Sequence, residues 1–404
     1  MKTRNDRGMG LYIHIPFCIT KCAYCDFLSF ECADADIQER YVQALLSEMA
    51  YARNYSGPMD IPFDTVYIGG GTPTALPTPL LCKILQEAQN FNLENNAEIT
   101  IEMNPCTNAQ SLLPALKASG VNRLSIGLQA WQNHLLAAIG RAHTNTDFAE
   151  TIKAAHNADI TNINVDLMFG LPGQTHEAWH ESISQVIAYR PTHISAYSLT
   201  PAEDTPLWDA LETGKAELPC EATDRTMYHK AISMLADAGY QHYELSNFAK
   251  PGFQSRHNVN CWLRRPYIGL GLGAHSFNGN TRWSNTSDME QYLRWSPVPL
   301  GADRFYQRWK NQQNESPNRN NMAENIEHLT TKDAMAETMF LGLRLTSGIN
   351  PQDFHAQFGK SLTEVYGNEL ETLITKGLLT HRNKSIALTP KGLDLANQVF
   401  ETFL

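Results

Sequence analysis

The feature that most constrains the fold of this chain is an alternation of short β-rich runs with longer amphipathic stretches. Six runs are typical of strands, at residues 10–16, 64–68, 98–103, 123–128, 162–167 and 193–199. Between the first two, apolar residues from position 41 to position 49 recur at helical spacing, as a helix packed on a sheet requires. Strands that alternate with helices in this way predict an α/β fold with a parallel sheet.

Residues that could bind a ligand lie at or directly after the carboxyl ends of the first five strands. They are the loop that holds Cys18, the glycine run at 69–71, Glu102 with Asn104, Gln129, and Asp166. In a barrel these strand ends converge on one mouth, which is where barrel active sites are built. We therefore predict a partial (β/α)6 TIM-like barrel rather than an open sheet, with a further strand near residues 240–245 on its rim.

The composition changes after the barrel region. We assign residues 1–300 to the barrel domain, 301–330 to a polar linker or insert, and 331–404 to a small α+β domain of winged-helix type. The expected elements of that domain are helices at 333–345 and 362–376, a hairpin at 377–388 that turns near Asn383, and a last helix from Pro390. Its seven basic and eight acidic residues favour a lid or packing role over DNA binding.

Length and charge limit the partners. The chain has 404 residues and a formal net charge of −10, and its basic residues are dispersed, so we expect small molecules or proteins and no nucleic acid. We see no apolar signal segment and no run long enough to cross a bilayer. Eight cysteines are too few for a disulfide scaffold, which indicates a reducing, cytoplasmic compartment.

Cys18, Cys22 and Cys25 form a Cys-x3-Cys-x2-Cys run directly after the first strand. An iron-sulfur cube takes one thiolate per iron, so three cysteines would leave one iron open to another molecule. A closed zinc site needs a fourth ligand, for which His14 and Cys32 are the nearest stand-ins, and unligated thiols remain a third interpretation. No metal-ligand spacing is found among the more distant cysteines Cys32, Cys82, Cys106 and Cys220. Met335 and Met339 are predicted to be core residues.

The glycine run continues as Gly-Gly-Gly-Thr-Pro-Thr over residues 69–74. Without a Cβ, such a backbone can approach a ligand closely, although a tight turn between strand and helix uses the same residues. No Gly-Lys-Ser/Thr follows and the Gly-x-Gly-x-x-Gly spacing is absent, which excludes the common nucleotide fingerprints.

Taken together, the cysteine loop, the run at residues 12–18 and the Gly-Gly-Gly-Thr-Pro-Thr motif resemble the radical S-adenosylmethionine superfamily. Residues 166–175 (Asp-Leu-Met-Phe-Gly-Leu-Pro-Gly-Gln-Thr) and the segment from His257 to Trp262 resemble its oxygen-independent coproporphyrinogen oxidase-like branch, and within that branch the haem chaperones. The resemblance covers nearly the whole chain, with the motifs in order.

The resemblance implies cofactors and roles. Cys18, Cys22 and Cys25 would hold a 4Fe-4S cluster whose open iron binds S-adenosylmethionine, and one electron from the cluster would cleave the sulfonium. The residues that it implies around S-adenosylmethionine are Tyr12, Tyr24, Gly70, Gly71, Thr72, Glu102, Gln129, Arg141, Asp166 and Ser198. A carboxylate suits ribose hydroxyls and an arginine suits the methionine carboxylate.

A second set of residues, His257, Asn258, Cys261 and Trp262, is where the resemblance implies haem contact. Imidazole is a good axial ligand and an indole face can stack on a porphyrin. The family pattern is His-Asn-x-x-Tyr-Trp, so Cys261 stands where a tyrosine is usual. The alternative is that His257 caps a loop and Trp262 belongs to the core.

This chain differs at two points from the coproporphyrinogen-processing members of the branch. Coproporphyrinogen-processing members carry a further cysteine where this chain has Phe27, and a longer segment before the motif. Both departures favour a haem chaperone that passes haem, as cargo, to acceptor proteins such as respiratory enzymes. An oxygen-independent coproporphyrinogen III dehydrogenase is the alternative, and a binding module without turnover is a third. Whether the protein is an enzyme, whether it forms a homodimer and whether it touches a membrane peripherally stay open.

Overall fold

The computed structural model describes residues 8–31, 34–55, 61–105, 108–294 and 323–404. Its centre is a sheet with the strand order β14-β13-β12-β11-β1-β4-β5-β6-β7-β8-β10-β9. The six expected parallel strands are all present, as β1 (Met9–Ile15), β4 (Phe63–Gly70), β5 (Leu93–Met103), β6 (Arg123–Gln129), β7 (Ile163–Phe169) and β8 (His193–Ser198). They pair in this order without a break, which confirms the predicted α/β fold.

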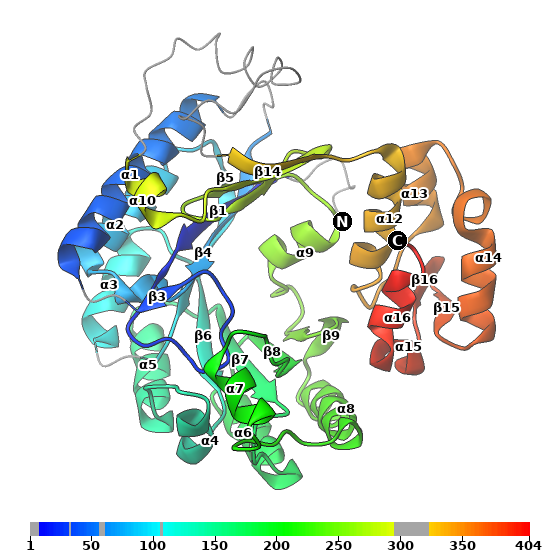
Figure 1. The fold of residues 1–404 in the computed structure, drawn as a ribbon, viewed down its shortest axis with the longest axis horizontal. Helices are drawn as coiled ribbons and strands as arrows, with labels where there is room; N and C mark the ends of the chain where they lie inside the picture. Colours follow the sequence, from blue (N-terminus) through cyan, green and yellow to red (C-terminus); the bar gives the residue numbers. More distant parts are fainter. Residues whose placement is uncertain (1–7, 32–33, 56–60, 106–107, 295–322) are drawn as a thin grey trace.

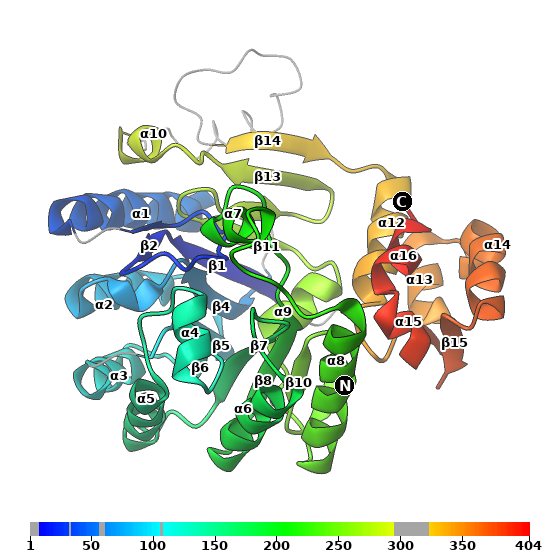
Figure 2. The same ribbon diagram turned by 60° about the horizontal axis from the view of Figure 1, so that its bottom comes forward.

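Helices cover the outer face of this sheet (Figures 1 and 2). They are α1 (Ala35–Tyr55), α2 (Thr78–Ala88), α3 (Ala109–Ala118), α5 (Asn145–Asn157), α6 (His176–Ala188) and α8 (Glu221–Asp237). The shorter α4 (Asn133–Ala138) and α7 (Pro206–Glu212) instead pack in a separate apolar cluster beside the cysteine loop. The outward strand residues, among them Ile13, Ile101 and Val165, are fully buried against these helices. The apolar half of each strand therefore faces outward and the polar half faces the barrel interior.

The sheet is wider than expected, because short strands extend it at both ends. Next to β1 lie β11 (Tyr267–Leu270), which is parallel to it, and then the antiparallel β12 (His275–Phe277), β13 (Thr281–Asn285) and β14 (Ala323–His328). Next to β8 lie the antiparallel β10 (Asn247–Ala249) and β9 (Gln241–Glu244), the latter matching the strand expected on the rim. The end strands β14 and β9 are not neighbours in this order, so the barrel is partial.

β14 lies inside the segment expected to be a polar linker or insert, so residues 323–328 of that segment form a strand of the sheet. Most of its residues are exposed, and it is held by backbone pairing with β13 at the edge of the sheet. An edge strand needs little apolar burial, so composition alone does not reveal it. The expected polar stretch before it lies mostly outside the described residues, and the division into domains stays a prediction.

The remaining short elements are β2 (Phe17–Cys18), β3 (Phe30–Glu31), the 3-10 turn η2 (Pro73–Ala75), α9 (Arg256–Trp262) and α10 (Met289–Arg294). Of these, α9 lies on the inner side of the sheet (Figure 1), beside the first residues of β1 and β4. None of the helices in the described ranges combines the length and the apolarity needed to span a membrane.

The C-terminal part contains α12 (Thr331–Gly342), α13 (Pro351–Phe358), α14 (Leu362–Thr375), β15 (Leu379–Arg382), β16 (Ser385–Leu388), α15 (Pro390–Asp394) and α16 (Ala396–Glu401). The two expected helices, the hairpin and the last helix are present, and the turn falls at Asn383 and Lys384 with positive φ. Met335 and Met339 lie in its separate core, as expected. Figure 1 shows this part, orange to red, beside α8 and α9.

Candidate functional site

The cysteine loop lies at the carboxyl end of β1, and backbone contacts hold it in place. Cys18 ends β2 and is buried, whereas Cys22 and Cys25 are half-buried in a turn closed by a hydrogen bond from the Cys25 N–H to the Cys22 carbonyl (3.2 Å). Between them, the Ala23 N–H donates to the Ile139 carbonyl (3.0 Å) and the Ala23 carbonyl accepts from Leu207 N–H (2.8 Å). Strand β1 therefore presents the three thiols at the barrel mouth.

A chain of side-chain contacts connects two of these cysteines. The Thr72 hydroxyl donates to Cys18 Sγ (3.7 Å), and Asn104 Nδ2 donates to the Thr72 hydroxyl (3.0 Å). Arg141 then donates to Asn104 Oδ1 through Nη2 (2.7 Å) and to Cys22 Sγ through Nη1 (3.4 Å). A guanidinium and a hydroxyl aimed at sulfur would stabilise thiolates, as a cluster site requires.

Two of the three thiols, those of Cys18 and Cys25, lie in surroundings that disfavour the thiolate. Burial raises the pKa of Cys18, against a smaller opposite effect of the Thr72 hydroxyl, and burial likewise raises the pKa of Cys25. Within the described residues no three His, Cys, Asp or Glu side chains converge on a single ion position. A cube bonds each thiolate to a different iron, so separate thiols on one loop are compatible with it.

The glycine run forms a close-fitting wall beside the loop. Gly70 has a φ of +115°, and a Cβ there would lie 2.5 Å from the His14 ring. A Cβ on Gly71 would lie 2.7 Å from the Phe17 carbonyl and 3.1 Å from Cys18 Sγ. Glycine is thus required at position 70 by backbone conformation and by space, and at position 71 by space.

Two carboxyl groups occupy the barrel interior below the loop. Glu102 accepts hydrogen bonds from the Tyr67 hydroxyl (2.7 Å) and the Gly70 N–H (3.2 Å), and burial together with the charge of Asp166 raises the pKa of Glu102 to about 7. Asp166 accepts from Asn164 Nδ2 (2.7 Å) and the Ser125 hydroxyl (3.3 Å), and burial raises the pKa of Asp166. Both carboxyl groups are held in place by neighbouring donors.

Gln129 and Arg141 leave polar atoms without partners at the mouth. Gln129 ends β6 at a register shift with a φ of +65°, and its Nε2 donates to the Tyr197 hydroxyl (3.4 Å). Among the described residues its buried Oε1 has no donor, and the buried Nε of Arg141 has no acceptor. A strained residue and orphaned polar atoms at one place are typical of a ligand site. S-adenosylmethionine, with its ammonium, carboxylate and hydroxyl groups, fits these donors and acceptors.

Tyr12, Tyr24 and the neighbouring His14 contact groups around the mouth, and both ring nitrogens of His14 are occupied. Tyr12 stacks on Tyr67 with 6.4 Å between ring centroids, and its hydroxyl pairs with His14 Nδ1 (2.9 Å). Because His14 Nε2 pairs with the Leu28 carbonyl (2.8 Å), both ring nitrogens have partners, which disfavours His14 as a fourth metal ligand. Burial raises the pKa of Tyr24, which lies close enough to Arg141 to feel its charge. Cys32 and Cys106 lie outside the described residues.

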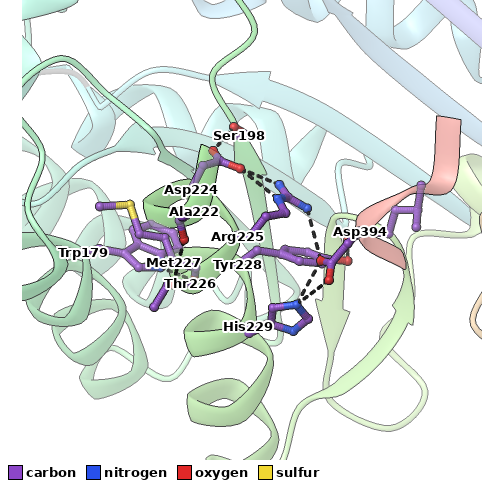
Figure 3. A network of polar contacts seen from close by, with 11 residues as sticks. Trp179, Ser198, Ala222, Asp224, Arg225, Thr226, Met227, Tyr228, His229 and Asp394 are labelled. Atoms are coloured by element: carbon purple, nitrogen blue, oxygen red, sulfur yellow. Dashed lines mark hydrogen bonds and ion pairs between the residues drawn. The ribbon is translucent and has the colours of Figure 1, made fainter. Parts of the chain in front are cut away.

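Ser198, at the end of β8, is part of a polar network that reaches the C-terminal domain (Figure 3). Its hydroxyl donates to Asp224, and Asp224 pairs with Arg225 (2.6 Å). The Asp394 carboxylate on α15 pairs with the Arg225 guanidinium (3.7 Å) and with Nε2 of His229 (2.9 Å). A cavity of about 540 Å³, with Ser198, Arg225 and Asp394 in its wall, lies beside this network. Ser198 therefore connects the rim of the mouth to the neighbouring domain.

The residues with implied haem contact lie at the other end of the barrel. His257 is buried on α9, where its Nδ1 pairs with the Thr65 hydroxyl (3.0 Å) and its ring stacks on Tyr67 at 5.1 Å. A Cβ on Gly10, at the start of β1, would lie 3.1 Å from the His257 ring. Burial lowers the pKa of His257 to about 4, so the imidazole is neutral. As an axial ligand His257 would need α9 to move.

Among the other residues of this motif, Trp262 contacts the C-terminal domain. The Arg344 guanidinium covers the Trp262 ring at 4.2 Å, and among the described residues the buried indole Nε1 has no acceptor. Burial raises the pKa of Cys261 to about 12, which makes a thiolate unfavourable there without metal. The Asn258 backbone N–H donates to the Ser255 hydroxyl (3.4 Å) as part of the α9 cap. The haem assignments stay predictions.

The structure thus brings the implied cofactor residues other than Ser198 together, whereas the implied haem residues lie at the opposite end of the barrel. It also adds residues outside the implied set, namely Asn104, Tyr67, Tyr197, Ser125 and Asn164. The signal for the last two is the alternation in the first half of β6 and β7, where Ser125 and Asn164 lie two residues from Arg123 and Asp166 and therefore face the same side.

Comparison with known proteins agrees with this arrangement. Residues 12–186 match the family model of the radical SAM superfamily, and residues 329–395 match the model of the HemN C-terminal domain. A solved structure, coproporphyrinogen III oxidase (HemN) from Escherichia coli, superimposes with a TM-score of 0.80 at 22% identity, covering 98% of this chain and 90% of that one. Fold and mouth together define a radical S-adenosylmethionine protein.

Relatives of known family show which radical S-adenosylmethionine proteins this chain is similar to in sequence over nearly its full length. The "Heme chaperone HemW" of Bacillus subtilis is 35% identical over 97% of this chain and 98% of its own length, and that of Lactococcus lactis is 34% identical over 97% and 96%. A mitochondrial radical S-adenosyl methionine domain-containing protein 1 of Mus musculus is 30% identical over 98% and 87%. The chain belongs to the HemW family.

Proposed function

We propose that this protein is a cytoplasmic haem chaperone that holds a 4Fe-4S cluster with S-adenosylmethionine and passes haem to acceptor proteins such as respiratory enzymes. The observation that carries the proposal is near-full-length similarity to proteins named heme chaperones, in a chain whose barrel mouth retains the cysteine loop. Phe27 adds support, because it stands 65% exposed where the oxidase pattern has a further cysteine.

The mouth residues supply the binding chemistry. Cys18, Cys22 and Cys25 would hold the cluster, and Arg141 and Thr72 would stabilise its thiolates from outside. When bound, the cluster would supply one electron to S-adenosylmethionine. Gln129 Oε1, which has no donor in the described part of the chain, would accept a hydrogen bond from the ammonium group of S-adenosylmethionine. The carboxyl groups of Glu102 and Asp166 would accept hydrogen bonds from its ribose hydroxyls.

The cluster part is tested by replacing single cysteines. After anaerobic reconstitution, Cys22→Ser should lose most of its bound iron and sulfide and the absorbance of the cluster. Cys82→Ser, a half-buried thiol on α2, is the matched control and should retain them. Equal loading of both variants would contradict the assignment.

The chaperone part is tested in one preparation of the reconstituted protein. Haem is titrated while the Soret band is followed, coproporphyrinogen conversion is assayed, and transfer to an apo-acceptor is measured. We expect haem binding and transfer without conversion, and turnover to protoporphyrinogen would overturn the proposal. His257→Ala, with exposed His355→Ala as control, tests the axial ligand separately, because only the former should alter the Soret spectrum.

A further inference from the structure

The middle of the barrel interior contains a buried arginine that the cofactor assignments do not use. Tyr67, Thr100 and Arg123 are register partners on β4, β5 and β6, so their side chains face the same side of the sheet. That side is the barrel interior, because the Tyr67 hydroxyl binds Glu102 and its ring stacks on His257. Arg123 thus lies between the cofactor mouth and the α9 floor.

Arg123 is enclosed but not paired. Its exposed fraction is 2%, its buried Nε has no acceptor among the described residues, and none of their carboxylates lies within ion-pair distance of its guanidinium. The hydroxyl of the neighbouring Thr100, fully buried, is likewise without a partner in the described part of the chain. A buried cation without a partner is unfavourable, so two adjacent orphaned groups indicate a missing anionic ligand.

The nearby acids do not serve as counter-ions. The Glu102 carboxyl is bound by Tyr67 and the Gly70 N–H, and Asp166 by Asn164 and Ser125. Neither lies within 4.0 Å of Arg123, although Arg123 is close enough to lower the pKa of both by a minor amount. The two carboxyl groups are thus held by other donors and leave the guanidinium fork free.

The imidazoles on the floor side are not anionic partners either. Burial and, to a smaller extent, the charge of Arg123 lower the pKa of His193 and His257, so both rings are neutral. His193 is in turn bound by Asn164 (2.6 Å) and the Tyr243 hydroxyl (2.8 Å). The surroundings of Arg123 therefore offer it dipoles and neutral rings, and the position for a carboxylate stays unfilled by protein groups.

We propose that Arg123, assisted by Thr100, binds a carboxylate of a ligand inside the barrel, and that this carboxylate is a propionate of haem. The identity of the ligand rests on the proposed function. A guanidinium presents a planar fork that matches a carboxylate with two hydrogen bonds, and haem carries two propionates. The other source of a carboxylate is S-adenosylmethionine, for which Arg141 already stands at the mouth.

The test compares haem with its dimethyl ester, which lacks the negative charges. Both are titrated into the reconstituted protein and into Arg123→Met, with binding followed by the Soret band. We expect the wild type to prefer haem over the ester by tenfold or more and Arg123→Met to reduce this preference to about one. Thr100→Val should reduce it partly. Arg53→Met, which removes a paired arginine on α1, is the matched control and should keep the full preference.

The outcomes separate the inference from the function. Unchanged preference in Arg123→Met, with haem still bound, overturns the inference and leaves the chaperone proposal standing. No haem binding by the wild type overturns the proposed function. A second titration compares S-adenosylmethionine with its decarboxylated analogue. If Arg123→Met loses the preference of the wild type for S-adenosylmethionine, the Arg123 guanidinium binds the carboxylate of the cofactor, and the assignment to a haem propionate is overturned. If Arg123→Met does not fold, Arg123→Lys keeps the charge without the fork and should lower the preference at least threefold.

Discussion

Arg141 is the residue at which the cysteine loop and the strand ends meet. It contacts Cys22 from one side and Asn104 from the other, and its backbone N–H is held by the Leu136 carbonyl. Glu102 has a similar position deeper in the barrel, where it joins Tyr67 to the Gly70 backbone. Single side chains at the mouth therefore hold neighbouring elements in register as well as offering groups to a ligand.

The raised pKa of Glu102 makes stability depend on pH. The folded protein keeps this proton up to about pH 7, whereas an unfolded chain releases it near the usual value of 4.5. Between these values only the folded state binds the proton, so the free energy of unfolding falls as the pH rises through this window. In metal-free wild-type protein we expect the free energy of unfolding to decrease by about 2 kcal/mol across this window. Glu102→Gln should not show this decrease, because its amide does not titrate.

Urea unfolding at pH 5 and pH 8 measures this difference. Exposed Glu371→Gln on α14 is the control and should follow the wild type at both pH values. An equal fall in Glu102→Gln and in the wild type would show that the carboxyl is ionised in the folded protein throughout.

At the scale of elements, the glycine segment at the end of β4 and the helix α9 close the barrel interior from opposite sides. The former holds the cysteine loop through the Gly71 and Thr72 N–H groups, which donate to Ile15 and Phe17. The latter is held to the floor by Asn260, which donates to Asp64 (2.8 Å), and by Glu98, which accepts from the Arg256 N–H (3.0 Å).

Gly70→Ala should damage the mouth. The added Cβ meets the His14 ring at 2.5 Å and the backbone has a positive φ, so we expect a loss of about 2 kcal/mol or more and reduced iron loading. Gly252→Ala is matched in backbone, with a φ of +86° and open space, and should cost about 1 kcal/mol with full loading. Thermal unfolding and iron content measure both, and similar results for the two variants would contradict the steric argument.

The floor should loosen in acid. His257 is neutral in the folded protein down to about pH 4, whereas an unfolded chain protonates it near 6.5. The unfolded state therefore binds the extra proton between these values, and stability is lost as the pH falls through this window. We expect a loss of roughly 3 kcal/mol that His257→Gln removes.

Hydrogen exchange of α9 amides at pH 7 and pH 5 locates this effect. The acid loss should be concentrated in α9 and absent from the C-terminal core. Exposed His355→Gln should behave as the wild type does. Equal acid sensitivity of the wild type and His257→Gln would contradict the buried neutral imidazole.

At the scale of the whole molecule, the contacts between the C-terminal domain and the barrel include a backbone bridge between Glu244 and Leu345 and ion pairs on two sides. On one side Asp394 receives Arg225 and His229 of α8, as Figure 3 shows. On the other, Glu337 of α12 pairs with Arg264 (2.5 Å), next to the floor helix. One domain therefore touches both the rim of the mouth and the floor.

Asp394→Ala should loosen the first of these contacts. Both ion pairs are partly exposed, so we expect a cost of about 1 kcal/mol and faster proteolysis near α15, with the barrel intact. Glu371→Ala, exposed in the same domain, is the control. Limited proteolysis with mass spectrometry locates the cleavage, and identical patterns would show that other contacts fix the domain.

Sequence patterns predicted the parallel strands and the mouth, because strand ends converge whatever the loop lengths are. They did not predict β10 to β13, whose three to five residues are too few for a clear alternation. They also did not place His257, because its burial depends on Thr65 and Tyr67, nearly two hundred residues earlier in the chain. Arg123 was missed since a charged residue in a buried strand has no local signal.

Tyr67 touches both ends of this architecture, with its hydroxyl on Glu102 and its ring on His257. A fluorine label on that one ring would therefore act as a two-channel spectroscopic reporter. Cofactor arriving at the mouth would change the hydroxyl hydrogen bond, and displacement of the floor helix would change the ring stacking. Fluorine NMR of the labelled protein would follow the order in which the two ends respond.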